Sequence, residues 1–224
     1  MNICRLFLLL FIGSAMVGCT TVTIDQIRLD NTQIDPSKDT IVVLGRHHSS
    51  EYETEPSLVS CVGRKLKSNI GGGLNVIDET EFQNALYPWF EPRTAPLNLE
   101  KFIQILDQPY VEDALKQRNV KYMIWIEGGT EQTSSGGTLS CTILPGAAGC
   151  FGFGVWEDQS NYEASIWDFQ ETNEVGRIST DAQGTSYLPA IIIPLPLLAR
   201  VQANACDGMG DQIADFLQSS EEAS

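Results

Sequence analysis

Apolar positions follow two periods along this chain, one typical of strands and one of helices. Thr40–Gly45 is a β-branched apolar run ending at glycine, which predicts a buried strand. Pro56, with Thr54 before it as a cap, predicts a helix start, and Leu58, Val62 and Leu66 then recur every four residues. Three glycines end this helix at 71–73, and 74–78 predicts a second strand.

The rest of the chain continues this alternation. Apolar residues at helical spacing predict short helices over 79–87, 99–106 and 111–119, and a closing helix over 204–217. Apolar or alternating runs predict strands over 120–127, 162–169 and 174–181. Residues 128–137 predict a polar connection, and 138–156 an apolar, Gly-rich hairpin. This order predicts an α/β (α+β) fold, a single mixed β-sheet covered by helices.

The chain begins with a short apolar leader. Arg5 supplies one positive charge, Leu6–Ile12 is an unbroken apolar run, and the leader closes on Met16-Val17-Gly18 before Cys19. The layout is typical of a secretory signal, and the run is shorter than the roughly 20 residues that span a bilayer. We therefore expect a signal peptide over 1–18, a polar tether over 19–39, a domain over 40–218 and a disordered tail over 219–224.

The end of the leader resembles a bacterial lipobox, in which a small residue directly precedes a cysteine. Met16 stands where the lipobox usually has leucine. The resemblance implies that Cys19 becomes a lipidated N-terminus, carrying palmitate among its acyl chains, and anchors the chain to a membrane. Thr20 stands where an aspartate would favour inner-membrane retention. By the same resemblance the protein faces the periplasm from the outer membrane.

The net charge of −15 limits the partners. A strongly acidic chain repels nucleic acid and anionic lipid, and no block of Lys or Arg offsets this charge. We therefore expect no nucleic-acid partner, and membrane attachment through the N-terminal lipid alone.

Four cysteines remain beyond the leader and Cys19: Cys61, Cys141, Cys150 and Cys206. An even number in an exported chain suggests two disulfides, with three pairings open. Cys141 and Cys150 flank a strand-and-turn sequence, so this local pair is the first expectation. Cys61 and Cys206 are then left for each other, each beside the apolar stripe of its own helix. The alternatives are free thiols and a zinc site, which the lack of a Cys-x-x-Cys pair disfavours.

The main polar cluster is Arg46-His47-His48, which follows the first strand and precedes several glutamates. Ligands often bind at such strand ends, so metal binding and partner contact are both open, beside a solvated loop. Adjacent residues of an extended segment point to opposite sides, which disfavours a metal shared by His47 and His48. We expect no catalytic residue, no metal and no cofactor.

Two apolar stretches are open to two interpretations, core packing or an exposed surface. The first, 144–156, includes Phe151 and Phe153, and the second, 188–198, includes Ile191, Ile192 and Leu195. The second also holds three prolines, which argue against a regular central strand or helix. These stretches either pack over the sheet or present a surface to a partner or a membrane.

Three short sequences carry a family resemblance: Asn75–Glu79, Gln117–Trp125, and Ser165–Phe169 with Thr172–Gly176. From about Thr40 to Leu217 the chain resembles the small α/β domain of envelope lipoproteins. This group includes the amino-terminal domain of the Tol translocation protein, the curli-secretion lipoprotein and outer-membrane activators of penicillin-binding proteins.

The resemblance implies a non-enzymatic periplasmic domain that binds an envelope protein partner. Two alternatives remain. One is an exported metal-dependent hydrolase that uses the loop of His47 and His48. The other is a subunit of a lipoprotein ring.

Overall fold

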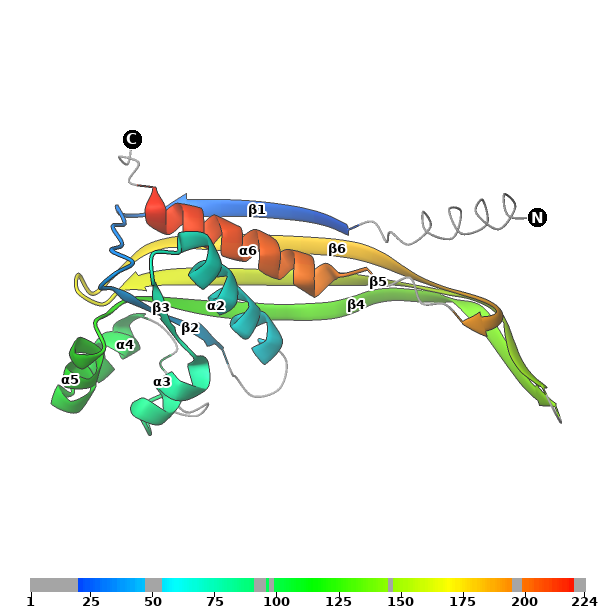
Figure 1. The fold of residues 1–224 in the computed structure, drawn as a ribbon, viewed down its shortest axis with the longest axis horizontal. Helices are drawn as coiled ribbons and strands as arrows, with labels where there is room; N and C mark the ends of the chain where they lie inside the picture. Colours follow the sequence, from blue (N-terminus) through cyan, green and yellow to red (C-terminus); the bar gives the residue numbers. More distant parts are fainter. Residues whose placement is uncertain are drawn as a thin grey trace. The chain divides into compact units, whose positions relative to one another are not determined.

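The structure, a computed structural model, describes residues 20–46, 54–90, 96, 99–144, 147–194 and 199–219, with only the backbone at 99, 143–144, 147–148 and 191–194. It has one mixed six-stranded sheet in the order β1-β6-β5-β4-β2-β3, together with helices that include one at the C-terminus (Figure 1). This confirms the predicted α/β class.

The elements alternate early in the chain and then become long strands. The strands are β1 (Thr20–Arg28), β2 (Thr40–Gly45), β3 (Asn75–Ile77), β4 (Val120–Leu144), β5 (Ala147–Asp168) and β6 (Asn173–Pro194). The described helices are α2 (Pro56–Ile70), α3 (Glu79–Ala85), α4 (Leu99–Leu106), α5 (Pro109–Gln117) and α6 (Val201–Gln218). The helix predicted at Pro56 is confirmed, but its N-cap is Glu55, because the Thr54 hydroxyl instead donates to the Ile126 carbonyl at 3.0 Å.

β2 pairs in parallel with both β3 and β4, so the chain order β2-α2-β3 forms a parallel unit with a helical crossover. The register places Ile41 opposite Val76 and Leu44 opposite Trp125. The register also places Gly45, the last residue of β2, opposite Ile126, so β2 ends beside the interior of the longer strand β4.

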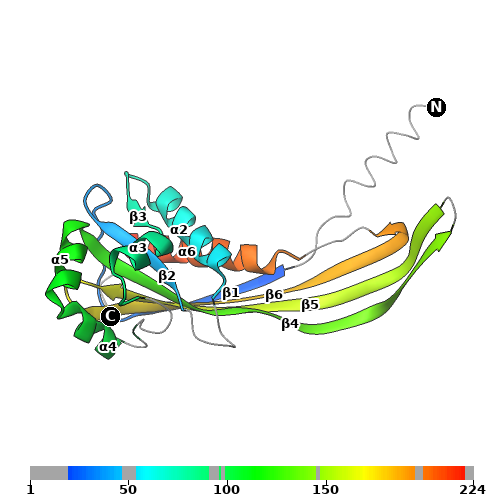
Figure 2. The same ribbon diagram turned by 90° about the horizontal axis from the view of Figure 1, so that it is seen from below.

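Alternate residues of β4 enter two separate cores. Tyr122, Ile124 and Ile126 are buried on one face, and α2 covers it, because Val43, the register partner of Ile124, lies 4.0 Å from a Cβ placed on Gly63 of α2. Figure 2 shows α2 and α6 on one face of the sheet. Met123 and Trp125 enter a second cluster with residues of α3, α4 and α5. This burial on both faces explains why residues 120–127 are apolar without alternation.

The described chain divides into two compact units. The hairpin unit comprises the described residues within 20–22, 130–160 and 182–204. The core unit comprises 23–129, 161–181 and 205–219. Both cores described above lie in the core unit.

Residues 20–28 form a strand where we predicted a tether. β1 is antiparallel to β6, as shown by the hydrogen bond from the Leu29 amide to the Val175 carbonyl at 2.9 Å and a contact from Thr21 Oγ1 to the Gln183 carbonyl at 3.5 Å. The Thr, Val and Ile residues of this segment favour extended backbone, and β6 supplies the partner that a lone segment lacks.

The predicted connection 128–137 is also wrong, since β4 runs without a break from Val120 to Leu144. β6 likewise includes Pro189 and ends at Pro194, although we expected these prolines to exclude a regular strand. Among the described residues, β1 begins at Thr20, next to Gly184 of β6, and Pro189 lies beyond this described pairing. A missing N–H is tolerated at the edge of a sheet.

The ends of the chain are described only in part. The predicted signal peptide and Cys19 lie outside the described residues, as does the tail beyond Ser219. The Ser219 amide donates a hydrogen bond to the Asp215 carbonyl at 2.9 Å, which holds this residue against the end of α6. Among the described helices, none combines the length and the apolar character needed to cross a bilayer.

Candidate interaction surfaces

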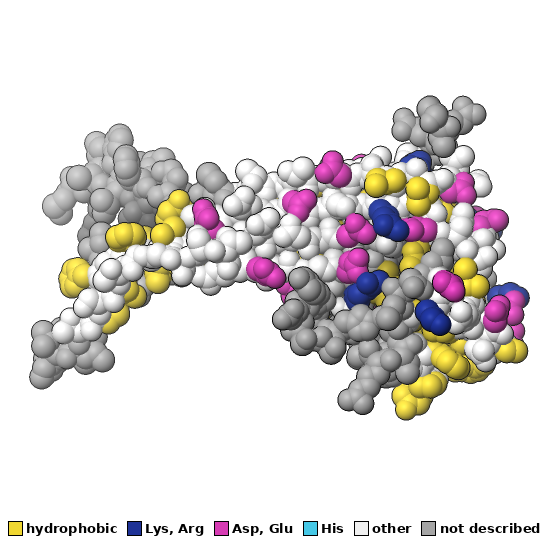
Figure 3. All heavy atoms as spheres, turned by 180° about the vertical axis from the view of Figure 1, so that it is seen from behind, with side chains coloured by type: hydrophobic (Ala, Val, Ile, Leu, Met, Phe, Trp, Pro, Cys, Tyr) yellow, Lys and Arg dark blue, Asp and Glu magenta, His cyan; other side chains and the backbone are white. Residues whose placement is uncertain are grey.

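The hairpin unit exposes large aromatic side chains on its strands. Phe151 and Phe153 of β5 are 59% and 60% exposed, and Tyr187 of β6 is 49% exposed. Figure 3 shows hydrophobic side chains on this part of the molecule. Folding leaves more than half of each phenylalanine in contact with solvent.

These three side chains share one face, which we call the aromatic face (Phe151, Phe153 and Tyr187). Phe151 and Phe153 are two residues apart on one strand and therefore point to the same side. A Cβ placed on Gly154 would lie 3.6 Å from Leu188 Cβ, so 154 and 188 share the opposite side. Phe153 and Tyr187, one residue before each of these, therefore share the aromatic side.

A disulfide closes the hairpin next to this face. Cys141 of β4 and Cys150 of β5 are bonded, with their Cα atoms 4.0 Å apart. Phe151 directly follows Cys150, so the covalent link limits how far the two strands can separate beside it. The predicted local pairing is confirmed.

A second surface, which is polar, lies where β2 ends beside the interior of β4. Arg46, just after β2, forms an ion pair with Glu127 of β4 at 2.6 Å, and its guanidinium lies 5.6 Å from the Trp125 ring centroid. Both residues line a cavity of about 510 Å³ with Gly128, Asn161, Tyr162, Glu163, Ser179 and Asp181.

The charged residues of the cavity lining are mostly acidic, with Glu127, Glu163 and Asp181 against Arg46. Nearby, Arg177 contacts Glu163 at 3.8 Å and Glu174 at 2.5 Å, and the Glu174 carboxylate raises the pKa of Arg177. The described lining residues supply hydroxyl, amide and carboxylate groups, which can donate and accept hydrogen bonds. Sequence reasoning missed these acids because they come from separate strands.

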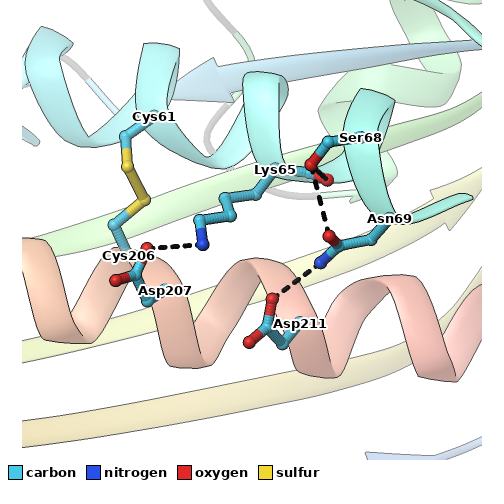
Figure 4. The surroundings of a disulfide bond; sticks show 7 residues. All are labelled: Cys61, Lys65, Ser68, Asn69, Cys206, Asp207 and Asp211. Atoms are coloured by element: carbon cyan, nitrogen blue, oxygen red, sulfur yellow. Dashed lines mark hydrogen bonds and ion pairs between the residues drawn. A yellow bond between two sulfur atoms is a disulfide. The ribbon is translucent and has the colours of Figure 1, made fainter. Parts of the chain in front are cut away.

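A second disulfide joins the first and last described helices of the core unit. Cys61 of α2 and Cys206 of α6 are bonded, with Cα atoms 6.2 Å apart, which confirms the predicted pair (Figure 4). Lys65 Nζ lies 2.8 Å from Asp207 Oδ1, and Asn69 Nδ2 donates to Asp211 Oδ1 at 2.6 Å. The hydrogen bond to the Asp207 carboxylate raises the pKa of Lys65, so the contact favours the charged ammonium.

Cys61, Cys206 and Asp207 also bring potential metal-ligand atoms within 4.8 Å of one another. A thiolate is the form of cysteine that binds metal, and both sulfurs are engaged in the disulfide. In this form the group is a covalent tie between helices.

Tyr122 of β4 has a buried side chain whose hydroxyl forms hydrogen bonds within the core unit. The Tyr122 hydroxyl accepts from the Gln33 amide at 3.0 Å and donates to the Gln33 carbonyl at 3.2 Å. Burial raises the pKa of Tyr122 to about 12. The group is therefore a neutral structural hydrogen-bonding partner near physiological pH.

The predicted site residues have different outcomes. The structure places Arg46 at the acidic cavity and exposes Phe151 and Phe153. His47, His48 and Leu195 lie outside the described residues, and Ile191 and Ile192 are described only as backbone of β6. Tyr187 was missed because it stands just before the apolar stretch 188–198 and follows the polar residues Thr185 and Ser186.

No protein-family model matches this chain, and no curated protein matches it. Among solved structures, the chain is similar to the PelC dodecamer from Paraburkholderia phytofirmans. A single-substitution variant of PelC is 13% identical at a TM-score of 0.40, and the match covers 88% of this chain and 99% of that chain. A second PelC structure is 10% identical, with the same TM-score of 0.40 and the same coverage.

Proposed function

We propose that this protein is a lipid-anchored outer-membrane lipoprotein that binds an envelope protein partner through the aromatic face and carries out no catalysis. The observation that carries the proposal is the exposure of Phe151 and Phe153, at 59% and 60% on one side of a strand. Aromatic residues are enriched at protein interfaces, and exposed apolar groups on one face mark such sites.

The N-terminal sequence supports the membrane anchor. Cys19 ends a lipobox-like leader, and Thr20 directly after it already belongs to β1. The described fold thus begins one residue after the proposed lipid, which keeps the hairpin unit near the membrane surface. Two disulfides agree with an oxidising compartment such as the periplasm.

A photo-crosslinking amino acid at position 153 of the full-length chain tests the partner. The matched control places it at Gln183, an exposed polar residue of β6 in the same unit. We expect one discrete crosslinked protein from position 153, none from 183, and loss of the product when Phe151→Ser is added. Equal products from both positions, or none from either, would contradict the proposal.

The crosslinked product also separates the alternatives. A product of this chain with itself would support the ring subunit in place of a different partner. Stoichiometric zinc in the purified protein, lost on changing His47 and His48 to Ala, would support the hydrolase and overturn the non-catalytic function.

A further inference from the structure

Helix α4 carries two apolar side chains, Ile103 and Leu106, that are buried only in part, although Leu106 also packs against the core cluster of α3, α4 and α5. Phe102 and Ile105 are 1% and 8% exposed and belong to the core cluster that also holds Met123 and Trp125. Ile103 and Leu106, three residues apart and therefore neighbours on the helix surface, are only half-buried. Both line a cavity of about 750 Å³ in the core unit.

The apolar floor of this cavity comes from three further elements. Leu115 of α5 and Val120 of β4 are buried below it, and Phe169 begins the turn between β5 and β6. The Phe169 ring packs edge-on against Phe102, with centroids 5.0 Å apart. Figures 1 and 2 both show α4 and α5 beside this turn. The volume lies within the roughly 300–1,000 Å³ of typical ligand sites.

The rim of the cavity is polar and acidic. Glu112 and Lys116 of α5 form an ion pair with each other, which neutralises both charges locally. Asp107, after the end of α4, is exposed, and no described residue forms an ion pair with its carboxylate. With a chain charge of −15, this carboxylate favours a cationic group at the rim.

The turn that closes the cavity has an unusual backbone. Thr172 lines the cavity at a φ of 53°, a left-handed conformation that β-branched residues rarely adopt. The Asp168 carboxylate holds the turn by accepting from the amides of Gln170 and Glu171 at 2.7 and 3.0 Å. Such strained positions are concentrated at binding sites.

We propose that this cavity binds a segment of a protein partner that inserts one aliphatic or aromatic side chain and carries a lysine or arginine beside it. The apolar floor accepts the inserted side chain, and Asp107 receives the cation. The inference rests on the partner-binding function proposed above, but it assigns a second surface, in the core unit.

Three acetylated and amidated tripeptides test the chemistry, with tryptophan between two lysines, two glutamines or two glutamates. Each is titrated into the full-length chain in detergent micelles, and backbone amide shifts are followed by NMR. We expect saturable shifts confined to 99–120 and 168–172. At low salt the lysine peptide should bind about two- to fivefold more tightly than the glutamine peptide, the range of an exposed ion pair.

Matched variants assign the contacts. Asp107→Asn should remove the preference for the lysine peptide, whereas Asp113→Asn, an exposed acid of α5 outside the cavity lining, should keep it. Leu106→Asn should weaken all three peptides, and its thermal unfolding is measured alongside. The proposal would be overturned if the three peptides bound with equal affinity, if the shifts did not saturate, or if they lay outside 99–120 and 168–172. It would also be overturned if Asp107→Asn still preferred the lysine peptide.

The two proposals fail separately. If the lysine peptide binds at the cavity but position 153 forms no crosslink, the aromatic face is contradicted and the cavity stands. If the crosslink forms but no peptide binds, only the cavity proposal is overturned. A chain carrying Phe151→Ser and Phe153→Ser should bind the lysine peptide as the unchanged chain does.

Discussion

At the scale of single residues, Arg28 closes the end of α6. Its guanidinium donates to the Phe216 carbonyl at 2.7 Å, to Ser219 Oγ at 2.9 Å and to Thr32 Oγ1 at 3.1 Å. It also lies 3.8 Å from the Phe216 ring centroid. The last carbonyls of a helix lack partners within the helix, so one side chain at the end of β1 fixes the position of the C-terminal helix.

Arg28→Lys should therefore lower the free energy of unfolding by about 1–3 kcal/mol, because an ammonium cannot reproduce the planar fork or the ring stacking. Urea denaturation measures the change, and Arg200→Lys at an exposed position is the control. Equal stabilities of the two variants would show that the contacts of Arg28 contribute nothing specific.

Tyr122 gives the core a pH dependence in the alkaline range. The folded pKa is about 12, and an unfolded tyrosine ionises near pH 10. The stabilisation is therefore complete below about pH 10 and is lost as the pH rises toward 12, by up to roughly 2–3 kcal/mol. Tyr122→Phe should remove this decline.

The midpoint of urea denaturation between pH 8 and 11 measures this effect. Tyr122→Phe should also be less stable at neutral pH by about 1 kcal/mol, because it loses the bonds to Gln33. Tyr187→Phe, at an exposed position, is the control. The same alkaline decline in Tyr122→Phe as in the unchanged chain would rule out Tyr122 as its source.

At the scale of elements, α2 and α6 pack closely because α6 has a glycine at the contact. A Cβ on Gly210 would lie 2.6 Å from Lys65 Cβ, well inside van der Waals contact. The same approach places Cys61 beside Cys206 and Asn69 beside Asp211 (Figure 4). One small residue thus sets the helix spacing that the disulfide and polar contacts require.

Gly210→Ala should push the two helices apart and cost about 1–3 kcal/mol of stability. Gly63→Ala in α2 is the matched control, because its added Cβ would meet Val76 Cγ1 at an ordinary 3.6 Å. That variant should be unchanged or up to about 1 kcal/mol more stable through helix propensity. The midpoint of thermal unfolding is measured for both variants. A Gly210→Ala variant more stable than the unchanged chain would contradict the close approach of the two helices.

At the scale of the whole molecule, the two disulfides differ in the length of chain that they close. Cys61–Cys206 spans 145 residues, whereas Cys141–Cys150 spans 9. By the chain-entropy relation these loops are worth about 5 and about 2–3 kcal/mol. Replacing Cys61 and Cys206 by Ser should therefore lower the midpoint of thermal unfolding more than replacing Cys141 and Cys150. The reverse order would contradict the loop-length account.

The proposed lipid is expected to provide the membrane attachment. Cys19→Ala should abolish acylation and release the chain from membranes, since the acidic charge gives no electrostatic attachment to anionic lipid. Fractionation without detergent measures the release, and Cys4→Ala within the leader is the control. A Cys19→Ala chain that stays with the membrane fraction would contradict the lipid anchor.

The sequence by itself determined the elements whose signal is local. The strand at 40–45 and the helix from Pro56 each bury a continuous run or stripe, and period alone reveals such patterns. The disulfide pairs were also predictable, since Cys141 and Cys150 flank a turn and the other two flank helical stripes.

Only the tertiary structure decided the long strands and the exposed surfaces. Residues 20–28 and 128–137 are Thr-, Ser- or Gly-rich. They form strands because neighbouring strands offer hydrogen bonds, and the hydrophobic period of the segment itself does not predict such pairing. Whether Phe151, Phe153 and Leu106 are core or surface depends on what covers them. The covering segments are distant in sequence, so the apolar character of a residue does not by itself predict whether its side chain is exposed.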